Sequence, residues 1–322
     1  MKKLLIATLL NAYRLNKQFD GQTNERIIGE KQDVVTKGDI EIGDLIVKEL
    51  LEDKSSRVIV ESEEHGKQQN FEDGQEEYYI AIDDIDGSNN LRVGNGMLPY
   101  CSMIVVFKRN AEHEDYTFDD YAYAACIDHV SGRIFYTEKG LGFVEEYDSN
   151  GTKIGDSRDN IQDNSNLALT LSTDIVSSTR GGKTGYGKGK EVTASVLPSV
   201  LDGVYRKYAI VDSGCSVFEY AMTGMGIRNG YVSTGKKMHE LPLLYAFCKE
   251  TGQDMCDFTG RSYDEITYDF SGGDAEVVAG RQRTIEEICR MIQRQNEANE
   301  RLKILIQRSL SSNPGNDGDR ER

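Results

Sequence analysis

The chain has 322 residues, of which 54 are Asp or Glu and 38 are Lys or Arg, so its formal net charge is −16. Its length allows one large domain or two ordinary ones, and a hydrophobic content of 38% is typical of globular rather than disordered chains. The acidic excess argues against binding to a nucleic-acid scaffold or to an anionic membrane, because both need a positive protein surface.

The N-terminal half is predicted to combine two helices with a sheet. Residues 1–10 imitate a short signal peptide, but polar residues follow and no small-x-small cleavage site is present, so an amphipathic helix is the favoured interpretation. A second helix is predicted over 39–51, where apolar side chains recur with helical spacing. The strands predicted in this half cover residues 57–60, 78–82, 102–107, 121–127 and 133–136, and polar turns are predicted over 66–75 and 110–116.

The C-terminal half alternates between strands and helices, which indicates an α/β arrangement. A basic, glycine-rich segment over 180–190 lacks the spacing of a P-loop and is interpreted as a solvated loop. We therefore predict an N-terminal α+β half over 1–160, a C-terminal α/β half over 161–292, and a helical extension with a disordered tail over 293–322. The elements predicted in the second half are strands at 167–171, 208–211 and 230–232, and helices at 216–224, 239–251 and from 284 onward.

The six cysteines contain no CxxC pair, and several lie in apolar runs. Scattered cysteines in a chain of this size are typical of reduced core residues, so zinc ribbons and disulfide scaffolds are excluded. No apolar run reaches the length of a membrane span. Together these features predict a cytoplasmic protein.

Two acidic clusters follow apolar strands and suggest a metal site. Glu63 and Glu64 come after the strand at 57–60, while Asp83 and Asp86 end the strand at 78–82. Carboxylates at a strand end are rigidly held at the rim of a sheet, and hard oxygen ligands suit Mg²⁺ or Mn²⁺. A metal-free Asx-rich turn is the alternative for the second cluster, but the first cluster favours metal binding.

The residues after Asp86 favour an anion site beside these acids. Gly87 permits close approach of the backbone, and the N–H groups of Gly87, Ser88 and Asn89 would face an anion at the start of a helix. An EF-hand is excluded, because its spacing would put apolar residues at the first and last loop positions.

Four blocks follow one another along the chain: DVVTKGD at 33–39, SEE at 62–64, DDIDGSNN at 83–90, and GCSVFEYA at 214–221 followed by HE at 239–240 and KETG at 249–252. In this order they resemble the inositol monophosphatase and fructose-1,6-bisphosphatase superfamily of metal-dependent, lithium-sensitive sugar phosphatases. The resemblance extends from about residue 33 to residue 292. It implies a layered α-β-α-β-α sandwich of the α/β (α+β) class, a phosphomonoesterase activity, and assembly as a homodimer or homotetramer.

The resemblance also implies roles for individual residues. Two or three Mg²⁺ ions would be bound, with Mn²⁺ as an alternative. Asp39 and Ser88, with Glu63 as a further catalytic residue, would order the attacking water, and the N–H groups of Gly87 and Ser88 would bind the phosphate. The implied metal ligands are Glu63, Asp83, the carbonyl of Ile85, Asp86 and Glu240.

The chain departs from the superfamily pattern near the predicted metals. Asp84 replaces the usual Pro, which is expected to add negative charge and loosen the turn. His239 stands where monophosphatases carry Trp, and is interpreted as structural, with a polar cap over the site as the alternative. Glu240, which follows it, resembles the fructose bisphosphatases rather than the monophosphatases, which have Asp there.

Four residues are candidates for substrate binding. Ser233 lies seven residues before Glu240, where inositol-specific members place a Glu, and a hydroxyl accepts hydrogen bonds less strongly than a carboxylate. Lys236 and Lys237 suit a second phosphate. Cys215 is the fourth candidate, with a small buried residue as the alternative interpretation.

These features together predict a Mg²⁺-dependent phosphomonoesterase that hydrolyses a small sugar phosphate with metal-activated water. A fructose-1,6-bisphosphatase-like activity is favoured. The alternatives are inositol-1-monophosphatase activity, with dual specificity, and 3′-phosphonucleotide phosphatase activity. A different class, a catalytically weak regulatory or binding homologue, is motivated by Asp84 and by the missing Trp. The expected partner is a small phosphorylated sugar or cyclitol.

Overall fold

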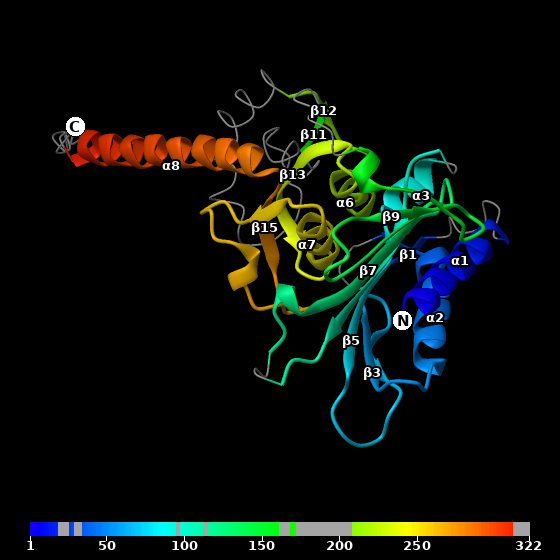
Figure 1. The fold of residues 1–322 in the computed structure, drawn as a ribbon. Helices are drawn as coiled ribbons and strands as arrows, with labels where there is room; N and C mark the ends of the chain where they lie inside the picture. Colours follow the sequence, from blue (N-terminus) through cyan, green and yellow to red (C-terminus); the bar gives the residue numbers. More distant parts are fainter. Residues whose placement is uncertain are drawn as a thin grey trace, which may run out of the picture.

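The computed structural model describes residues 1–18, 26–28, 34–94, 97–111, 115–160, 168–171 and 208–311. Its elements form five layers in the order helices, sheet, helices, sheet, helix (Figure 1). The predicted layered α-β-α-β-α sandwich is therefore confirmed. Residue 33 of the first sequence block, the basic segment 180–190 and the tail beyond residue 311 lie outside the described residues.

An eight-stranded sheet forms the larger of the two β layers, with strand order β10-β9-β8-β7-β6-β5-β3-β4. Only β3 and β5 pair in parallel within it; the other neighbours are antiparallel. The central strands are buried on both faces, which explains their continuous apolar runs. The strands are β3 Val58–Ser62, β4 Gly66–Gln69, β5 Tyr78–Asp86, β6 Cys101–Lys108, β7 Tyr121–Asp128, β8 Ile134–Glu138, β9 Glu145–Tyr147 and β10 Lys153–Asp156.

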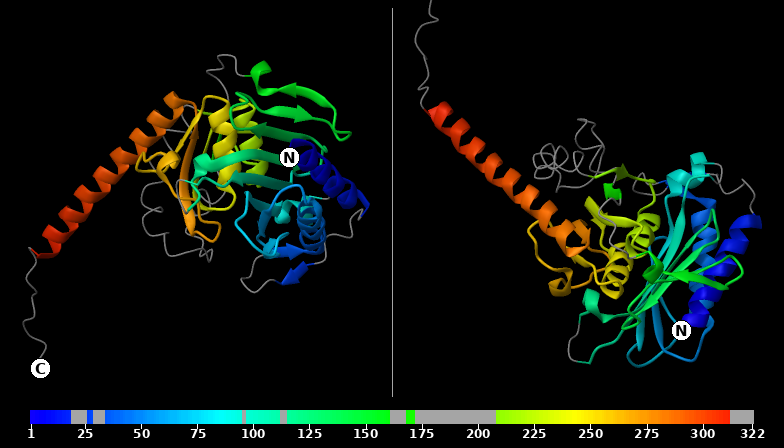
Figure 2. Two further views of the ribbon diagram at one scale, coloured as in Figure 1. Left: turned by 60° about the horizontal axis from the view of Figure 1, so that its bottom comes forward. Right: turned by 45° about the horizontal axis from the view of Figure 1, so that its top comes forward.

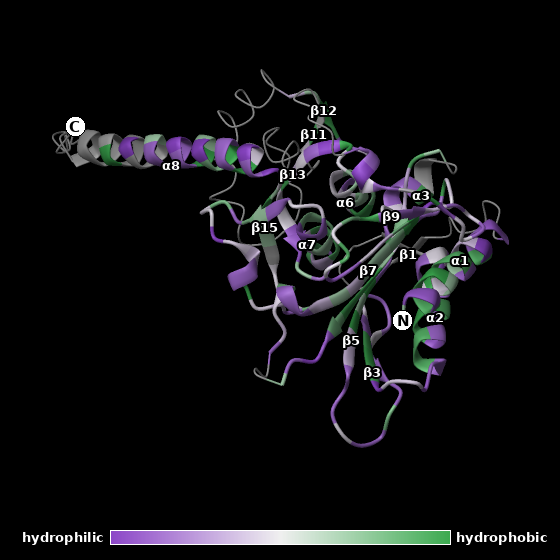
Figure 3. Cartoon of the chain, viewed as in Figure 1, coloured by the Kyte–Doolittle hydropathy of each residue, from purple (hydrophilic) through white to green (hydrophobic). Residues whose placement is uncertain are grey.

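Two helices, α1 Lys2–Gln18 and α2 Lys37–Glu52, cover the outer face of this sheet (Figure 1). Ile42, Ile46 and Leu50 are at most 1% exposed, so the apolar stripe predicted for α2 is confirmed. Both helices show green apolar positions alongside purple polar ones when the chain is coloured by hydropathy (Figure 3). The N-terminal apolar segment is part of a longer amphipathic helix, as predicted.

A five-stranded sheet, with strand order β12-β11-β13-β15-β14, forms the second β layer. Helices α6 Ser216–Gly224 and α7 Leu241–Glu250 lie between the two sheets (Figure 1). Nearly every residue of α7 is buried, because it contacts a sheet on each side. The strands of this sheet are β11 Ala168–Leu171, β12 Ile210–Val211, β13 Arg228–Lys237, β14 Asp254–Cys256 and β15 Asp274–Gly280.

Helix α8, Gln282–Ser311, provides the last layer. Its first turns pack Ile285, Ile288 and Ile292 against the small sheet, while its C-terminal part projects away from the body (Figures 1 and 2). The helix predicted from residue 284 is thus confirmed. No helix in the described residues is both long and apolar enough to cross a membrane.

The structure corrects one predicted turn and adds elements that the sequence did not indicate. Part of the polar segment 66–75 is the edge strand β4, whose backbone pairs with β3 while its side chains are exposed. Strands β9, β10, β14 and β15 were not predicted. A two-stranded ribbon of β1 Arg26–Ile28 and β2 Val34–Thr36 and a short helix α3 Ser88–Gly94 complete the set. The division into halves near residue 160 remains a prediction.

Glu250, at the C-terminal end of α7, connects this helix to the large sheet. Its buried carboxylate accepts hydrogen bonds from Tyr121 Oη at 2.5 Å, Gly140 N at 2.8 Å and Gly142 N at 2.6 Å. Replacing Glu250 with Ala leaves these donors without a protein acceptor, and we expect a loss of about 3–5 kcal/mol in the free energy of unfolding. Urea unfolding measures the loss. Glu250→Gln, which keeps one acceptor, is expected to lose less; equal stability of both variants and wild type would contradict this role.

Candidate metal centre

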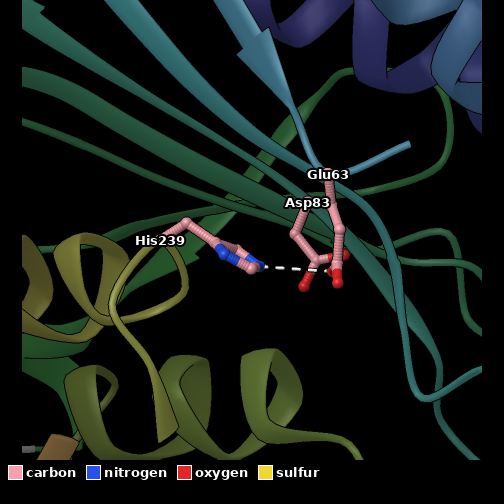
Figure 4. A group of neighbouring side chains, drawn as sticks. All are labelled: Glu63, Asp83 and His239. Atoms are coloured by element: carbon pink, nitrogen blue, oxygen red, sulfur yellow. Dashed lines mark ion pairs between the residues drawn. The ribbon is translucent and has the colours of Figure 1, made fainter. Parts of the chain in front are cut away.

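The acidic residues of the sequence blocks meet where β3 and β5 end. Because these strands are parallel and in register from Val58–Tyr78 to Ser62–Ile82, Glu63 after β3 and Asp83 on β5 emerge at the same edge of the sheet. One ligand atom from each of Glu63, Asp83 and His239 lies within 4.8 Å of the others (Figure 4). The structure therefore brings together two predicted metal ligands and one residue that had been interpreted as structural.

His239 lies in the short connection between β13 and α7, and it enters the centre from the side of the small sheet. Its Nε2 is 3.3 Å from Glu63 Oε2, and the imidazole is 5% exposed. Its ring stacks on Phe270 with ring centroids 4.9 Å apart. Sequence reasoning did not predict the contact with Glu63; the only signal was that His239 is adjacent to Glu240.

The two lysines at the end of β13 contact the carboxylates. The ammonium of Lys237 pairs with Glu63. Lys236 Nζ lies 3.8 Å from Glu240 Oε2 and donates a 2.5 Å hydrogen bond to Ser216 Oγ. Glu240 and Glu63 each form an ion pair with a lysine, whereas Asp83 forms none with the described residues.

The electrostatics of the centre are uneven. Burial, followed by the charges of Asp86, Glu63 and Glu240, raises the pKa of Asp83 well above its ordinary value. Burial also raises the pKa of Glu240. Burial acts to raise the pKa of Glu63 too, but His239 and Lys237 outweigh it and lower that pKa to about 2. The protein thus keeps Glu63 ionised and concentrates the cost of uncompensated negative charge on Asp83.

Asp86 and Gly87 form the turn that leads from β5 into α3. The ladder between β5 and β6 shifts between Asp83 and Asp86, and Asp86 Oδ2 accepts a 2.7 Å hydrogen bond from the N–H of Val217 in the first turn of α6. Gly87 has φ 88°, and a Cβ there would lie 3.2 Å from both Cys215 Cβ and the Pro99 carbonyl oxygen. Glycine is therefore required where the chain turns beside the carboxylates.

Ser88 and Asp39, predicted to order the attacking water, are directly hydrogen-bonded. Ser88 Oγ donates to Asp39 Oδ1 at 2.8 Å and lies 3.1 Å from the carbonyl oxygen of Ile85. Asp39 is on α2 and is 3% exposed. Residues from the first and third sequence blocks thus contact each other across α2 and α3.

Asp84 does not loosen the turn, contrary to expectation. It is 1% exposed, and its Oδ2 accepts hydrogen bonds from Ser62 Oγ at 2.6 Å and from Glu64 N at 3.3 Å, which connects the ends of β5 and β3. Burial raises the pKa of Asp84 to about 7. Its other oxygen faces Gly43 on α2, where a Cβ would come within 2.4 Å of it. A Pro at this position could not hold the two strand ends together in this way.

Two predicted substrate-binding residues are buried. Ser233, in the middle of β13, is 0% exposed. Cys215 is 1% exposed, and its thiol lies 3.5 Å from the carbonyl oxygen of Asp86, beneath the turn. Burial raises the pKa of this thiol to about 12. These positions give no support to direct contact of either side chain with a substrate, whereas Lys236 and Lys237 lie at the rim of the centre.

Comparisons with known proteins identify the architecture. No protein-family profile and no curated protein sequence matches the chain. Solved structures do match. An IMPase from Thermotoga maritima aligns with a TM-score of 0.64 at 16% identity, over 92% of this chain and 99% of that one. The chain has the inositol monophosphatase fold.

Two further neighbours with this fold are named for bisphosphatases. A protein described as an inositol monophosphatase–fructose 1,6 bisphosphatase aligns with a TM-score of 0.63 at 19% identity, over 89% of this chain and 97% of that one. A putative sedoheptulose-1,7 bisphosphatase from Toxoplasma gondii aligns with a TM-score of 0.65 at 12% identity, over 90% and 93% of the two chains. The resemblance inferred from four short blocks is therefore confirmed for the fold.

The donor set of this inositol monophosphatase fold suits a divalent cation. The buried carboxylate of Asp83 faces the charges of Asp86, Glu63 and Glu240, and a cation between them would offset their repulsion. Oxygen donors on rigid strand ends are suitable ligands for Mg²⁺ or Mn²⁺. The residues present therefore fit the metal that the sequence blocks imply.

Proposed function

We propose that the chain is a divalent-metal-dependent phosphomonoesterase that acts on a small phosphorylated sugar or cyclitol. The observation that carries the proposal is the convergence of Glu63, Asp86 and Glu240 on the buried Asp83, next to the hydrogen-bonded pair of Ser88 and Asp39. Carboxylates gathered at such a cost to the metal-free protein indicate a cationic ligand.

When bound, two or three Mg²⁺ ions, or Mn²⁺, would neutralise phosphate oxygens and lower the pKa of an attacking water. Glu63, Asp83, Asp86 and Glu240, with the carbonyl of Ile85, are the proposed ligands.

Residues beside these ligands act on the water and the phosphate. Asp39 accepts a hydrogen bond from Ser88 and so orients the hydroxyl that would face the water. The N–H groups of Gly87 and Ser88 lie at the N-terminal end of α3, beside the carboxylates, and would bind the phosphate oxygens.

A sugar bisphosphate similar to fructose-1,6-bisphosphate is the preferred substrate. Lys236 and Lys237 put two ammonium groups at the rim of the centre, and both could also contact a second phosphate of the substrate. Two of the structural neighbours are named for bisphosphatase activities, which supports the same choice. An inositol monophosphate and a phosphonucleotide remain the alternatives, since another neighbour was solved with inositol monophosphate and with 2′AMP.

A second class of function, a catalytically weak regulatory or binding homologue, is favoured by one observation. The ammonium of Lys237 already pairs with Glu63, a proposed metal ligand, and this pairing competes with metal binding. Such a homologue would bind the phosphorylated ligand without hydrolysing it.

A phosphate-release assay separates the two. The purified protein with Mg²⁺ or Mn²⁺ is given fructose-1,6-bisphosphate, inositol-1-phosphate and a 3′-phosphonucleotide, and it is compared with Asp86→Asn, which keeps an acceptor for the N–H of Val217. We expect wild type to release phosphate fastest from the bisphosphate, and the variant to be slower by on the order of 10²-fold or more. Asp254→Asn, an exposed position on β14, is the matched control. If wild type and Asp86→Asn release no phosphate from any of these substrates, the proposed enzymatic function is contradicted.

We further propose a cytoplasmic homodimer or homotetramer. The location is supported by the six cysteines, all of which are buried and unpaired in disulfides. The assembly rests on the resemblance to the superfamily. Light scattering of the purified chain tests it, and a monomer at micromolar concentration would contradict it.

A further inference from the structure

His239 sets this centre apart from an all-oxygen magnesium site. Its Nε2 is buried, makes no hydrogen bond with the described residues, and points toward Glu63 and Asp83 (Figure 4). Nε2 lies 3.3 Å from Glu63 Oε2. A buried nitrogen directed at two carboxylates is an arrangement that a metal ion would complete.

The imidazole is held in this orientation by its surroundings. Its ring stacks on Phe270 with an interplanar angle of 21°, and Phe270 itself packs against the main hydrophobic core. His239 also lies directly before Glu240, the N-cap residue of α7. Because the ring is already ordered, Nε2 could bind a metal with little further loss of conformational entropy.

An imidazolium–carboxylate ion pair is the competing explanation for the contact with Glu63. Glu63 already pairs with the ammonium of Lys237, so it does not need a second cation to be neutralised. Asp83 has no ion pair with any described residue, although its carboxylate lies within the same group of atoms. A metal ion shared by the imidazole and both carboxylates would give each of the three residues a partner.

We propose that His239 Nε2 is a direct ligand of the metal, and that the centre therefore selects a first-row transition ion, represented by Mn²⁺, over Mg²⁺. Mg²⁺ prefers oxygen donors and loses its water reluctantly, whereas imidazole suits transition ions. The inference rests on the proposed function for the role of the centre, but its test measures binding and not catalysis.

The experiment is a titration of the metal-stripped, full-length protein with Mn²⁺, followed by electron paramagnetic resonance. Bound Mn²⁺ is quantified from the loss of the free-ion signal, and pulsed spectra report whether a ¹⁴N nucleus is directly coordinated. We expect ¹⁴N coupling in wild type and its loss in His239→Gln. We also expect Mn²⁺ affinity to fall about tenfold or more in that variant, while Mg²⁺ affinity, measured by competition, changes far less.

His65→Gln is the matched control, because the imidazole of His65 faces Asp44 on α2 and is not part of the three-residue group. It should keep the ¹⁴N coupling. If His239→Gln does not fold, coupling that is present in wild type and retained in His65→Gln still supports the inference.

Bound Mn²⁺ without nitrogen coupling, or equal affinities of wild type for Mn²⁺ and Mg²⁺, would overturn the inference. Phosphate release by wild type in that case would leave the proposed function standing. Nitrogen coupling in a protein that releases no phosphate would support the inference about His239 and contradict the proposed function.

Discussion

Asp83→Asn is expected to abolish metal-dependent phosphate release and, at the same time, to stabilise the metal-free protein. Asp83 is the buried carboxylate at the middle of the proposed ligand set, so we expect activity to fall on the order of 10³-fold or more. Because burial and neighbouring carboxylates raise its pKa, the folded protein binds this proton more tightly than the unfolded chain does. The carboxylate therefore reduces stability increasingly as the pH rises above its ordinary pKa, and Asn removes that cost.

Thermal unfolding in EDTA at pH 8, with and without added Mn²⁺, measures the second effect. The variant should unfold several degrees above wild type in EDTA and should lose the stabilisation that metal gives to wild type. Near pH 4 the two metal-free proteins should unfold together. A variant that is less stable than wild type at pH 8 and still stabilised by metal would show that Asp83 has another role.

Asp84→Asn is expected to give a large gain in the stability of the metal-free protein. A pKa of about 7 in the folded protein, against an ordinary value of 3.8, corresponds to a cost on the order of 4 kcal/mol once both states are ionised. The sign is the same as for Asp83: the cost is absent below pH 4, grows between pH 4 and pH 7, and is constant above. Asn removes the charge and keeps an acceptor for Ser62 Oγ.

Urea unfolding in EDTA at pH 4, 6 and 8 checks this dependence. Asp84→Ala is the control, since it also removes the charge but leaves Ser62 Oγ and Glu64 N without their acceptor, so its gain should be smaller. If Asp84→Asn is less stable than wild type at pH 8, the carboxylate is ionised at no cost and the physical explanation is wrong.

Much of the fold could be predicted from the sequence because its elements have strong local patterns. The stripe of Ile42, Ile46 and Leu50 and the apolar runs of β5 and β6 reflect burial on one face or two. Strands β4, β9, β10 and β14 were missed because they are short edge or outer strands, several with polar or exposed side chains. In such strands pairing with a neighbour, and not the pattern, decides the conformation.

The candidate site was predictable in part, for a similar reason. Glu63, Asp83 and Asp86 lie next to buried strands, so their positions follow from the strands. The contact of His239 with Glu63 depends on how the small sheet approaches the large one, which no local pattern encodes. The hydrogen bonds of Asp84 to Ser62 and Glu64 likewise depend on parallel pairing of two strands that are distant in the chain.

The proposed ligands of the centre come from both sheets, and this has a consequence for folding. Glu63 and Asp83 lie on the large sheet, while His239 and Glu240 follow the last strand segment before α7. Long-range contacts of this kind form late, after the entropic cost of closing the intervening chain has been met. Metal ions bound by these residues would therefore not template the early steps of folding. They would stabilise a finished structure, so that their removal should speed unfolding more than it slows refolding.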